Sequence, residues 1–335
     1  MEHKYTVTDL SVLTPWYTKF AVEPLLKFVP WWLPANIITL LSNFCVLIAL
    51  VLTVLYTAGV FKFWLLVPLL IMAYVTGDSL DGKQARRTKT SSMLGEFLDH
   101  FLDIFTNGLL VSMTLLVYGI TEPAFISLYL VISYITLSGN YFEQHKYRVM
   151  FFEKIGAFEA VIMIVIVLSL GFIETSRNFL LKDVFAHISV FDMMLMVITF
   201  GSLYTLKRSL DRSGNSVIKG FLIFFLLTVS TAFFAARILP GAAIMFVMTA
   251  YCGTFIGKLH IAYLLREDEP KADFIFPLFL GTAYLFKLPV SVTVPAAVIF
   301  QMLNIIITFT AGFMNFRKYW LWVNPGPEFV DIYTT

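Results

Sequence analysis

Charged residues are scarce in this chain, and their scarcity excludes a water-soluble globular protein. Only 14% of the 335 residues are Asp, Glu, Lys or Arg, whereas soluble domains carry about 25%. Cysteine is also rare. Cys45 and Cys252 both fall inside apolar runs, so no structural disulfide is expected. Tandem repeats and low-complexity tracts are not seen. No cleavable signal is expected, because the chain begins MEHKYTVTDL rather than with a basic and then an apolar stretch.

Long hydrophobic runs are abundant instead, in a chain that is 59% hydrophobic. A bilayer span needs about 20 mostly apolar residues. The runs predict an all-α, polytopic integral membrane bundle of about ten transmembrane helices. The predicted spans are roughly 36–59, 61–77, 93–120, 122–141, 155–174, 185–206, 216–239, 241–265, 274–288 and 291–316.

The basic residues indicate how these spans are oriented. With the N-terminus in the cytosol, 18 lysines and arginines fall on the cytosolic side and five on the other, while Lys258 lies within a span. The positive-inside rule favours this orientation. It places residues 78–103 at the cytosolic face. The expected membrane is the endoplasmic reticulum or Golgi in a eukaryote and the inner membrane in a bacterium.

Residues 1–35 are predicted to form a cytosolic or interfacial amphipathic segment. Trp16 and Phe20 lean to one side of it, and Lys19 and Glu23 lean to another, as in segments that lie on a membrane surface. The alternative is a loop that packs on the bundle. Prolines at positions 15 and 24 are expected to break any long helix.

Acidic residues are concentrated in the stretch DSLDGKQARRTKTSSMLGEFLDHFLD, residues 78–103. Ionisable groups inside a bilayer cost about 2.5–3.5 kcal/mol each and usually mark function. Asp78 and Asp81 are spaced i,i+3, and Asp99 and Asp103 are spaced i,i+4. Either spacing places both carboxylates of the pair on one helix face.

The third predicted span separates polar from apolar residues around its axis. At 100° per residue from Gly95, its polar groups share one arc of about 140°. They are Glu96, Asp99, His100, Asp103 and Asn107. The remaining positions hold Phe97, Leu98, Phe101 and Leu102. The pattern predicts a polar face that looks into the bundle and an apolar face that looks away from it.

Four converging carboxylates repel one another and need counter-charge. Lys83, Arg86 and Arg87 are nearby candidates, but Mg²⁺ and Mn²⁺ prefer oxygen ligands and suit such a site better. Two such ions about 4 Å apart can stabilise phosphoryl transfer. Gly82 and Gly95 leave room for a close approach to the backbone, and Arg86 suits a phosphate.

Each of these features has a simpler interpretation when taken alone. Two acidic residues at i,i+4 more often form a solvated face, and Arg87 and Lys89 are interpreted as topological charges. The complete pattern D-x-x-D-G-x-x-A-R-x8-G-x-x-x-D-x-x-x-D is too specific for chance. It is met by Asp78, Asp81, Gly82, Ala85, Arg86, Gly95, Asp99 and Asp103.

This pattern resembles that of the CDP-alcohol phosphotransferases, integral membrane enzymes of phospholipid synthesis. The closer likeness is to the choline and ethanolamine phosphotransferase branch, which reads much like DGKQARRT and then matches Ser91, Ser92, Leu94, Glu96 and His100. Met93 replaces a usual proline, and Ala35-Asn36 stands for a usual Pro-Asn. The stretches DLSVLTPWY, LPANIITL and YCGTFIGKLHIAYLL are also similar.

The resemblance implies transfer of phosphoethanolamine or phosphocholine from CDP-ethanolamine or CDP-choline to diacylglycerol, releasing CMP. The products would be phosphatidylethanolamine or phosphatidylcholine, and the cofactors two Mg²⁺ or Mn²⁺ ions. It implies a transmembrane domain at 36–316, with a catalytic core at about 36–210, and a cytosolic tail at 317–335. Besides membrane lipid, a homodimer partner is compatible with the chain, and no nucleic acid is expected.

Site roles also follow from the resemblance. Asp78, Asp81, Asp99 and Asp103 would hold the metals, with Asp103 also counted among the catalytic groups. Gly82, Ala85 and Gly95 would line the cytidine pocket, and Arg86 and Asn36 would lie near the diphosphate. Glu96 and His100 would deprotonate the acceptor.

Two alternatives remain open. A phosphatidyltransferase of the same superfamily would use CDP-diacylglycerol as donor and inositol or glycerol phosphate as acceptor. Such chains usually have fewer spans, and Glu96 with His100 argues for the aminoalcohol branch. An ion or proton transporter would be expected to scatter its charged groups over several spans at the midplane. Here they cluster at one face.

Overall fold

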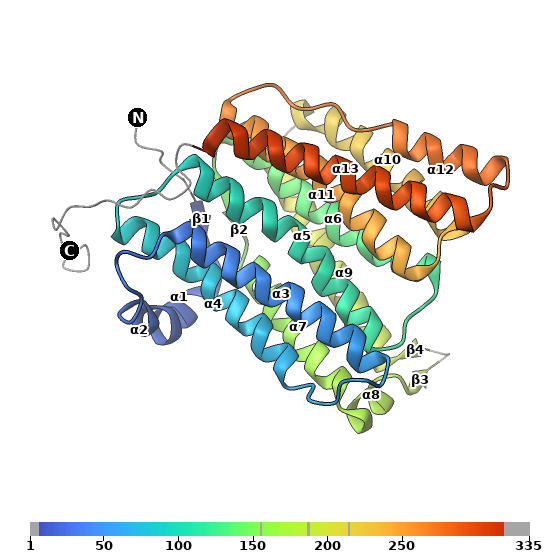
Figure 1. Cartoon of the computed structure of the whole chain (residues 1–335), viewed down its shortest axis with the longest axis horizontal. Coiled ribbons are helices and arrows are strands. Elements are labelled where there is room, and N and C mark those ends of the chain that lie inside the picture. Colours follow the sequence, from blue (N-terminus) through green and yellow to red (C-terminus); the bar gives the residue numbers. More distant parts are fainter. Residues whose placement is uncertain (1–6, 155, 186–187, 214, 318–335) are drawn as a thin grey trace.

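The computed structural model describes residues 7–154, 156–185, 188–213 and 215–317. The predicted tail 317–335 therefore lies outside the described residues except for Arg317. The described chain is an all-α bundle, as predicted, with two short strand pairs (Figure 1). Its main helices are α3 Ala35–Thr57, α4 Leu66–Arg87, α5 Met93–Val117, α6 Pro123–Tyr147, α7 Ala157–Phe172, α8 Glu174–Leu180, α9 Val190–Ser213, α10 Asn215–Ile238, α11 Gly241–Leu265, α12 Ile275–Leu285 and α13 Val290–Phe316.

A helix overlaps each of the ten predicted spans. Within the described ranges, seven helices are long and apolar enough to cross a bilayer, or eight if α7 and α8 form one span bent by 110°. These helices confirm an integral membrane protein. Helix α12 has 11 residues, which at 1.5 Å per residue reach about 16 Å and so fall short of a bilayer core of about 30 Å.

Several predicted boundaries differ from the structure. The predicted span 122–141 is α6, which reaches Tyr147. The predicted span 61–77 is α4, which begins at Leu66 and runs on through the charged motif to Arg87, because one of its faces is buried against other helices. The predicted span 155–174 ends at Phe172, where the chain turns sharply into α8. The predicted span 185–206 begins at Val190 and reaches Ser213.

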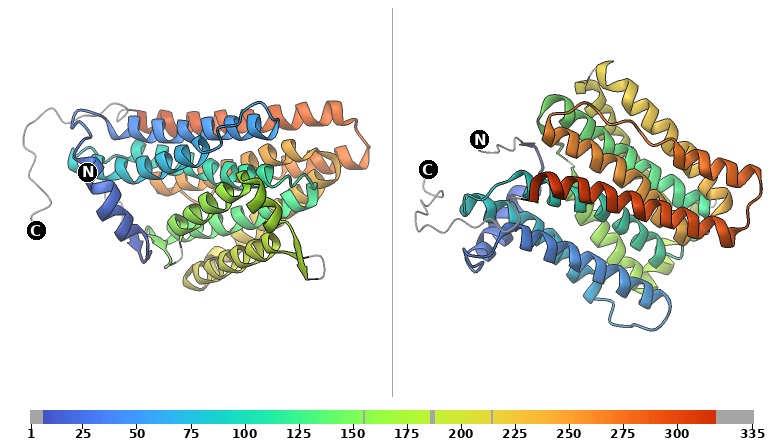
Figure 2. Two further views of the ribbon diagram at one scale, coloured as in Figure 1. Left: turned by 90° about the horizontal axis from the view of Figure 1, so that it is seen from below. Right: turned by 45° about the horizontal axis from the view of Figure 1, so that its top comes forward.

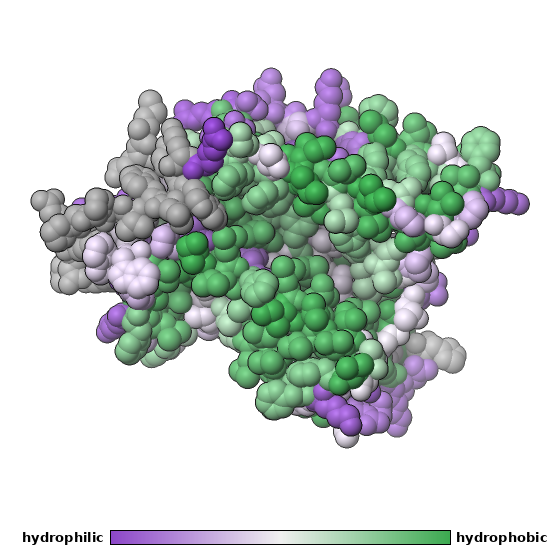
Figure 3. Space-filling model, viewed as in Figure 1, coloured by the Kyte–Doolittle hydropathy of each residue, from purple (hydrophilic) through white to green (hydrophobic). Residues whose placement is uncertain are grey.

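The bundle is several helices deep. Figure 2 shows α3 and α13 along one side of the molecule and α9 on the opposite side. Figure 3 shows hydrophobic residues covering the face formed by α3 and α13, with hydrophilic residues gathered toward its edges. A broad apolar surface of this kind is what a lipid bilayer requires, because lipid tails offer no hydrogen bonds.

The N-terminal segment is fastened to the bundle at several points. Strand β1 (Val7–Asp9) pairs in parallel with β2 (Met150–Phe152). The carboxylate of Glu159 then accepts hydrogen bonds from the backbone N–H groups of Val12 and Leu13, each at 3.0 Å. Farther on, Arg87 donates to the carbonyl oxygens of Leu26 at 2.6 Å and Val29 at 2.8 Å. Arg87 is therefore an anchor rather than only a topological charge.

No α-helix in the described part of this segment, residues 7–34, is longer than four residues, which agrees with the expectation that the prolines break any long helix. Helices α1 (Thr14–Tyr17) and α2 (Glu23–Leu26) are joined without a gap by the π-helical turn η1 (Thr18–Val22). Pro24 lacks an N–H group and crowds the preceding turn, and a wider turn just before it accommodates both effects. The segment also exposes Trp16, Phe20 and Phe28, so it is both anchored to the bundle and apolar on its outer surface.

The apolar face of α5 does not look away from the bundle, contrary to the prediction. Phe97 and Phe101 are at most 2% exposed. A Cβ atom at Gly312 of α13 would lie 2.2 Å from the Phe97 ring, and one at Gly257 of α11 would lie 2.7 Å from the Phe101 ring. The glycines on α13 and α11 therefore leave room for these two rings. Other helices therefore enclose both the polar and the apolar face of α5. This packing holds the polar residues of α5 in position.

Helices α3 and α4 approach each other closely at Gly77, where an added Cβ atom would lie 2.5 Å from Ser42 Cβ. We expect Gly77→Ala to destabilise the protein by about 1–3 kcal/mol, because the two helices must separate. The measurement is the apparent melting temperature of the detergent-solubilised protein.

Gly201→Ala is the matched control. Gly201 lies within α9, and a Cβ atom there would meet nothing within 4 Å. Its alanine variant should be neutral or more stable by up to about 1 kcal/mol, because alanine favours helix. Equal melting temperatures for the two variants would contradict the close crossing of α3 and α4.

Candidate functional site

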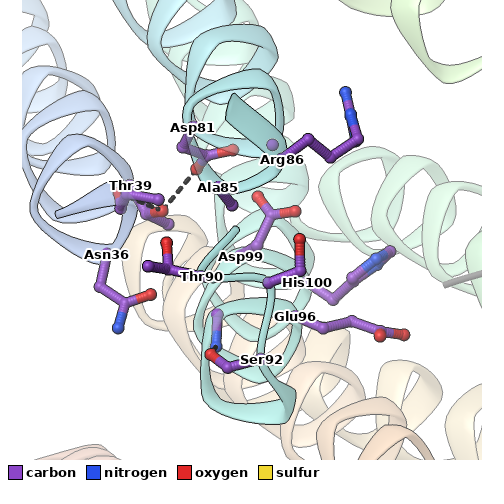
Figure 4. Close-up of a pocket in the computed structure, with 14 residues that line it drawn as sticks. Asn36, Thr39, Asp81, Ala85, Arg86, Thr90, Ser92, Glu96, Asp99 and His100 are labelled. Atoms are coloured by element: carbon purple, nitrogen blue, oxygen red, sulfur yellow. Dashed lines mark hydrogen bonds between the residues drawn. The ribbon is translucent and has the colours of Figure 1, made fainter. Parts of the chain in front are cut away.

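A cavity of about 310 Å³ lies where α4 ends and α5 begins (Figure 4). Its walls come from α3, α4, the turn after α4, and the first two turns of α5. The lining residues are Ala35, Asn36, Thr39, Asp81, Gly82, Ala85, Arg86, Thr90, Ser91, Ser92, Gly95, Glu96, Asp99 and His100. Nine of the eleven predicted site residues are among them. Asp78 and Asp103 lie one helical turn deeper.

The local sequence explains the shape of this end of the cavity. The Ser92 hydroxyl caps α5 by accepting a hydrogen bond from the Gly95 N–H at 3.1 Å, as serine commonly does at a helix N-terminus. A Cβ atom at Gly95 would lie only 3.2 Å from Asn36 Oδ1. Glycine at this position therefore allows the first turn of α5 to approach α3.

The aspartates form a compact cluster between α4 and α5. One carboxylate oxygen from each of Asp78, Asp99 and Asp103 lies within 4.8 Å of the other two. Asp81 is 5% exposed and accepts a hydrogen bond from the Thr39 hydroxyl, which Figure 4 shows as a dashed line. The two helix faces predicted from the sequence thus meet.

Tyr74 of α4 supports this cluster from within the bundle. The Tyr74 hydroxyl donates to Asp103 Oδ1 at 2.8 Å. Tyr74 is itself 6% exposed, so this hydrogen bond is sheltered from solvent. The sequence analysis did not identify Tyr74, although it lies four residues before Asp78 and so on the same face of the helix.

The nearby basic side chains do not all neutralise the aspartate cluster, because two of the three have other partners. Lys83 pairs with Glu23 on α2 at 3.5 Å. Arg87 is occupied by backbone carbonyls of the N-terminal segment. Of the three basic side chains proposed from the sequence, Arg86 alone lines the cavity.

The donor set fits a divalent cation. Asp99 Oδ1 is buried and has no hydrogen-bond partner among the described residues. Buried polar atoms nearly always have a partner, so this oxygen suits a ligand that the protein itself does not supply. All four carboxylates offer oxygen atoms, which Mg²⁺ and Mn²⁺ prefer.

Glu96 and His100 lie on the same side of the cavity as each other (Figure 4). Both are nearly buried, with exposures of 9% and 8%. His100 Nδ1 lies 3.1 Å from the Tyr141 hydroxyl of α6. The His260 ring of α11 lies 4.7 Å from the His100 ring, measured between centroids.

Tyr141 is not identified from the sequence, and a lone histidine within a span, such as His260, is expected from the sequence to be a core or interface residue. Each is a polar aromatic residue within an apolar run, and its partner is distant in the chain. No local spacing connects these two positions to the motif. Only the packing of α6 and α11 against α5 brings them together with His100.

The arrangement combines three chemical capabilities. A carboxylate cluster can bind divalent cations, a cavity with small walls can admit a flat ring, and a histidine beside a glutamate can accept a proton. A site of this composition suits phosphoryl transfer to a hydroxyl group.

Comparison with known proteins identifies similar sequences. The family model for CDP-alcohol phosphatidyltransferase matches residues 32–199. The chain is 23% identical to choline/ethanolaminephosphotransferase 1 of Saccharomyces cerevisiae over 317 residues, covering 82% of this chain and 80% of that protein.

Matches over shorter stretches have higher sequence identity. The chain is 38% identical over 112 residues to choline/ethanolaminephosphotransferase 2 of Arabidopsis thaliana, covering 30% of this chain and 28% of that protein. It is 36% identical over 107 residues to cholinephosphotransferase 1 of Bos taurus, covering 30% of this chain and 26% of that protein. The plant and bovine matches thus span about a quarter of those relatives.

The aspartate cluster predicts opposite effects of Asp99→Asn with and without metal. In EDTA, the variant should melt at a higher temperature than the wild type, because it removes one of four mutually repelling charges. In Mn²⁺ at 100 times its dissociation constant, the wild type should gain about 2.7 kcal/mol, and the variant should gain much less. Thermal melting of both proteins in the two buffers measures these effects.

Asp192→Asn serves as the control for this comparison. Asp192 is an aspartate in the first turn of α9, where it accepts a hydrogen bond from the Ser189 N–H at 2.9 Å. This variant should keep the full Mn²⁺ effect. An equal Mn²⁺ effect in the Asp99→Asn variant would exclude the cluster as the cation site.

Proposed function

Because the chain belongs to the CDP-alcohol phosphatidyltransferase family, we propose that it transfers phosphoethanolamine or phosphocholine from a CDP-aminoalcohol to diacylglycerol. The reaction releases CMP and forms phosphatidylethanolamine or phosphatidylcholine. One observation carries this proposal: Glu96 and His100 lie in the same cavity as Asp81 and Asp99 of the motif. The names of similar proteins, which include choline/ethanolaminephosphotransferases, support it.

The CDP moiety binds where small residues leave room. Gly82, Ala85 and Gly95 line the cavity and present no bulky side chain, so the flat cytosine ring can approach the helices. Asn36 is 7% exposed and adjoins Gly95, where its amide can donate to the nucleotide. Arg86 is exposed at the cavity wall and suits a phosphate oxygen.

The four aspartates hold the cofactors in this proposal. Asp78, Asp81, Asp99 and Asp103 would bind two Mg²⁺ or Mn²⁺ ions, which when bound supply positive charge that stabilises the phosphate groups during transfer. The hydrogen bonds from Thr39 to Asp81 and from Tyr74 to Asp103 hold two of these carboxylates in position. Such supporting contacts commonly orient metal ligands.

His100 accepts the proton of the acceptor hydroxyl. The acceptor oxygen forms a bond to the phosphorus that carries the aminoalcohol, and the bond from that phosphorus to the oxygen of CMP breaks. The proton moves to His100, and Glu96 stabilises the charged imidazole. A positioned base of this kind contributes about 10²- to 10⁴-fold to the rate.

The membrane setting suits both substrates. The cavity lies at one end of the bundle, where a water-soluble CDP-aminoalcohol can enter from solvent and a lipid alcohol can enter from the leaflet. We assign this end to the cytosolic face, in the endoplasmic reticulum or Golgi of a eukaryote or the inner membrane of a bacterium. The catalytic core is assigned to about residues 36–210, and the chain is compatible with a homodimer.

The choice of donor tests the proposed reaction. Purified protein with Mn²⁺ or Mg²⁺ should release CMP from CDP-ethanolamine or CDP-choline only after diacylglycerol is added, and the lipid product should appear in equal amount. The ratio of the two rates gives the headgroup preference. Product from CDP-diacylglycerol with inositol or glycerol phosphate, without activity on either aminoalcohol donor, would instead establish the related phosphatidyltransferase reaction.

Replacement of His100 tests the base. His100→Ala should lower kcat by about 10²- to 10⁴-fold while the dissociation constant for the CDP-aminoalcohol stays near the wild-type value. Steady-state kinetics and a donor-binding titration measure the two effects.

His145→Ala is the matched control, because His145 Nε2 bonds to the Glu267 carbonyl at 3.0 Å and does not line the cavity. The control should keep kcat. A His100→Ala variant that keeps kcat but loses donor affinity would place His100 in donor binding rather than in proton transfer.

A further inference from the structure

We propose that Tyr141 is a positioning residue that fixes the tautomer and orientation of the His100 imidazole, with His260 packed against both rings. This inference rests on the proposed role of His100 as the base for the acceptor. Tyr141 lies on α6 and His260 on α11, so neither belongs to the helices that carry the motif. They would act through His100 and would not touch the reacting atoms.

The Tyr141 hydroxyl contacts His100 at two points. It lies 3.1 Å from His100 Nδ1 and donates to the backbone carbonyl oxygen of His100 at 3.4 Å. Tyr141 is 4% exposed, so water does not compete strongly for these contacts. A single hydroxyl thus contacts both the ring and the backbone of the proposed base.

Proton counting links the tautomer of His100 to the direction of the Tyr141 hydrogen bonds. A phenol carries one proton. The 3.4 Å contact with the His100 carbonyl requires Tyr141 to donate, whereas the 3.1 Å contact with Nδ1 can run in either direction. We assign the proton to the carbonyl. The phenol oxygen can then only accept from the ring, so Nδ1 must carry a hydrogen. In the neutral imidazole this leaves the lone pair on Nε2, which is the form a general base needs. The carbonyl bond therefore selects the reactive tautomer.

His260 restricts rotation of the same ring. It is 0% exposed, and its ring centroid lies 4.7 Å from that of His100 at an interplanar angle of 34°. The Tyr141 ring meets His260 edge-on, at 5.6 Å and 85°. A 180° flip of the His100 ring would place Cδ2 where Nδ1 now lies, so it would break the Tyr141 contact and disturb this packing. The three rings together define one orientation of His100.

The chain supplies a close structural control on the same two helices. Tyr134 lies two turns before Tyr141 on α6, is 0% exposed, and donates its hydroxyl to the Ile104 carbonyl of α5 at 3.0 Å. Both tyrosines thus link α6 to a backbone carbonyl of α5. Only Tyr141 also contacts a histidine of the cavity.

Kinetics of Tyr141→Phe and Tyr134→Phe separate positioning from stability. Tyr141→Phe keeps the ring but removes the hydroxyl. It should lower kcat by about 10- to 100-fold, the range found for groups that orient metal-bound histidines, without raising the KM for the CDP-aminoalcohol. Tyr134→Phe should lower the melting temperature to a similar degree and leave kcat near the wild-type value. Equal kcat values in the two variants would overturn the proposal.

A second kinetic comparison uses the base itself. In a His100→Ala background, adding Tyr141→Phe should cause no further loss of the residual rate, because there is no ring left to position. A further loss of the same size as in the wild-type background would assign Tyr141 a role independent of His100.

A spectroscopic measurement tests the inference even if the reaction is different from the one proposed. In protein labelled with ¹⁵N-histidine, the His100 ring should show a protonated Nδ1 and an unprotonated Nε2, with the signal assigned by its absence from His100→Ala. Tyr141→Phe should shift this signal toward a mixture of tautomers, and Tyr134→Phe should not. A His100 signal that is unaltered by Tyr141→Phe would refute the positioning role, whereas a wild type inactive on every aminoalcohol donor would refute only the proposed function.

Discussion

Mutual repulsion among closely spaced carboxylates is the constraint on which the rest of this structure depends. At 4.8 Å, two unit charges repel by about 3.5 kcal/mol at an effective dielectric constant of 20. Asp78, Asp99 and Asp103 form three such pairs, and the basic side chains beside them mostly serve other partners. Thr39 and Tyr74 relieve part of this cost by donating hydrogen bonds. Bound divalent cations would relieve the remainder. The repulsion that destabilises the folded chain would therefore also strengthen the binding of these cations.

The surrounding helices hold the carboxylates at this distance. Helix α5 is enclosed because glycines of α11 and α13 admit its phenylalanine rings, and α3 lies against α4 because Gly77 has no side chain. The N-terminal segment adds a further restraint, since Gln84 Nε2 donates to the carbonyls of Pro30 at 3.0 Å and Leu33 at 2.9 Å. These contacts immobilise α4 just where it forms the cavity wall. Rigid helices of this kind suit a site whose carboxylates and histidine must keep a fixed spacing.

Much of the site could be predicted because its ligands are close in sequence. The i,i+3 and i,i+4 spacings determine which residues share a helix face, so the cavity contains most of the residues expected there. Contacts between distant helices could not be predicted this way. The burial of Phe97 against α13, the contact of Tyr141 with His100, and the capture of backbone carbonyls by Arg87 all depend on tertiary packing. The extension of α4 to Arg87 was missed because hydropathy reports membrane length and not helix length.

The number of Mn²⁺ ions bound per chain tests the central claim most directly. Electron paramagnetic resonance of purified protein, titrated with Mn²⁺ in the presence of CMP, counts the bound ions and detects magnetic coupling between neighbours. The account predicts two coupled ions per chain, both lost when Asp78, Asp81, Asp99 and Asp103 are replaced together by Asn. A single uncoupled ion in the wild type, or two ions retained in the fourfold variant, would contradict it.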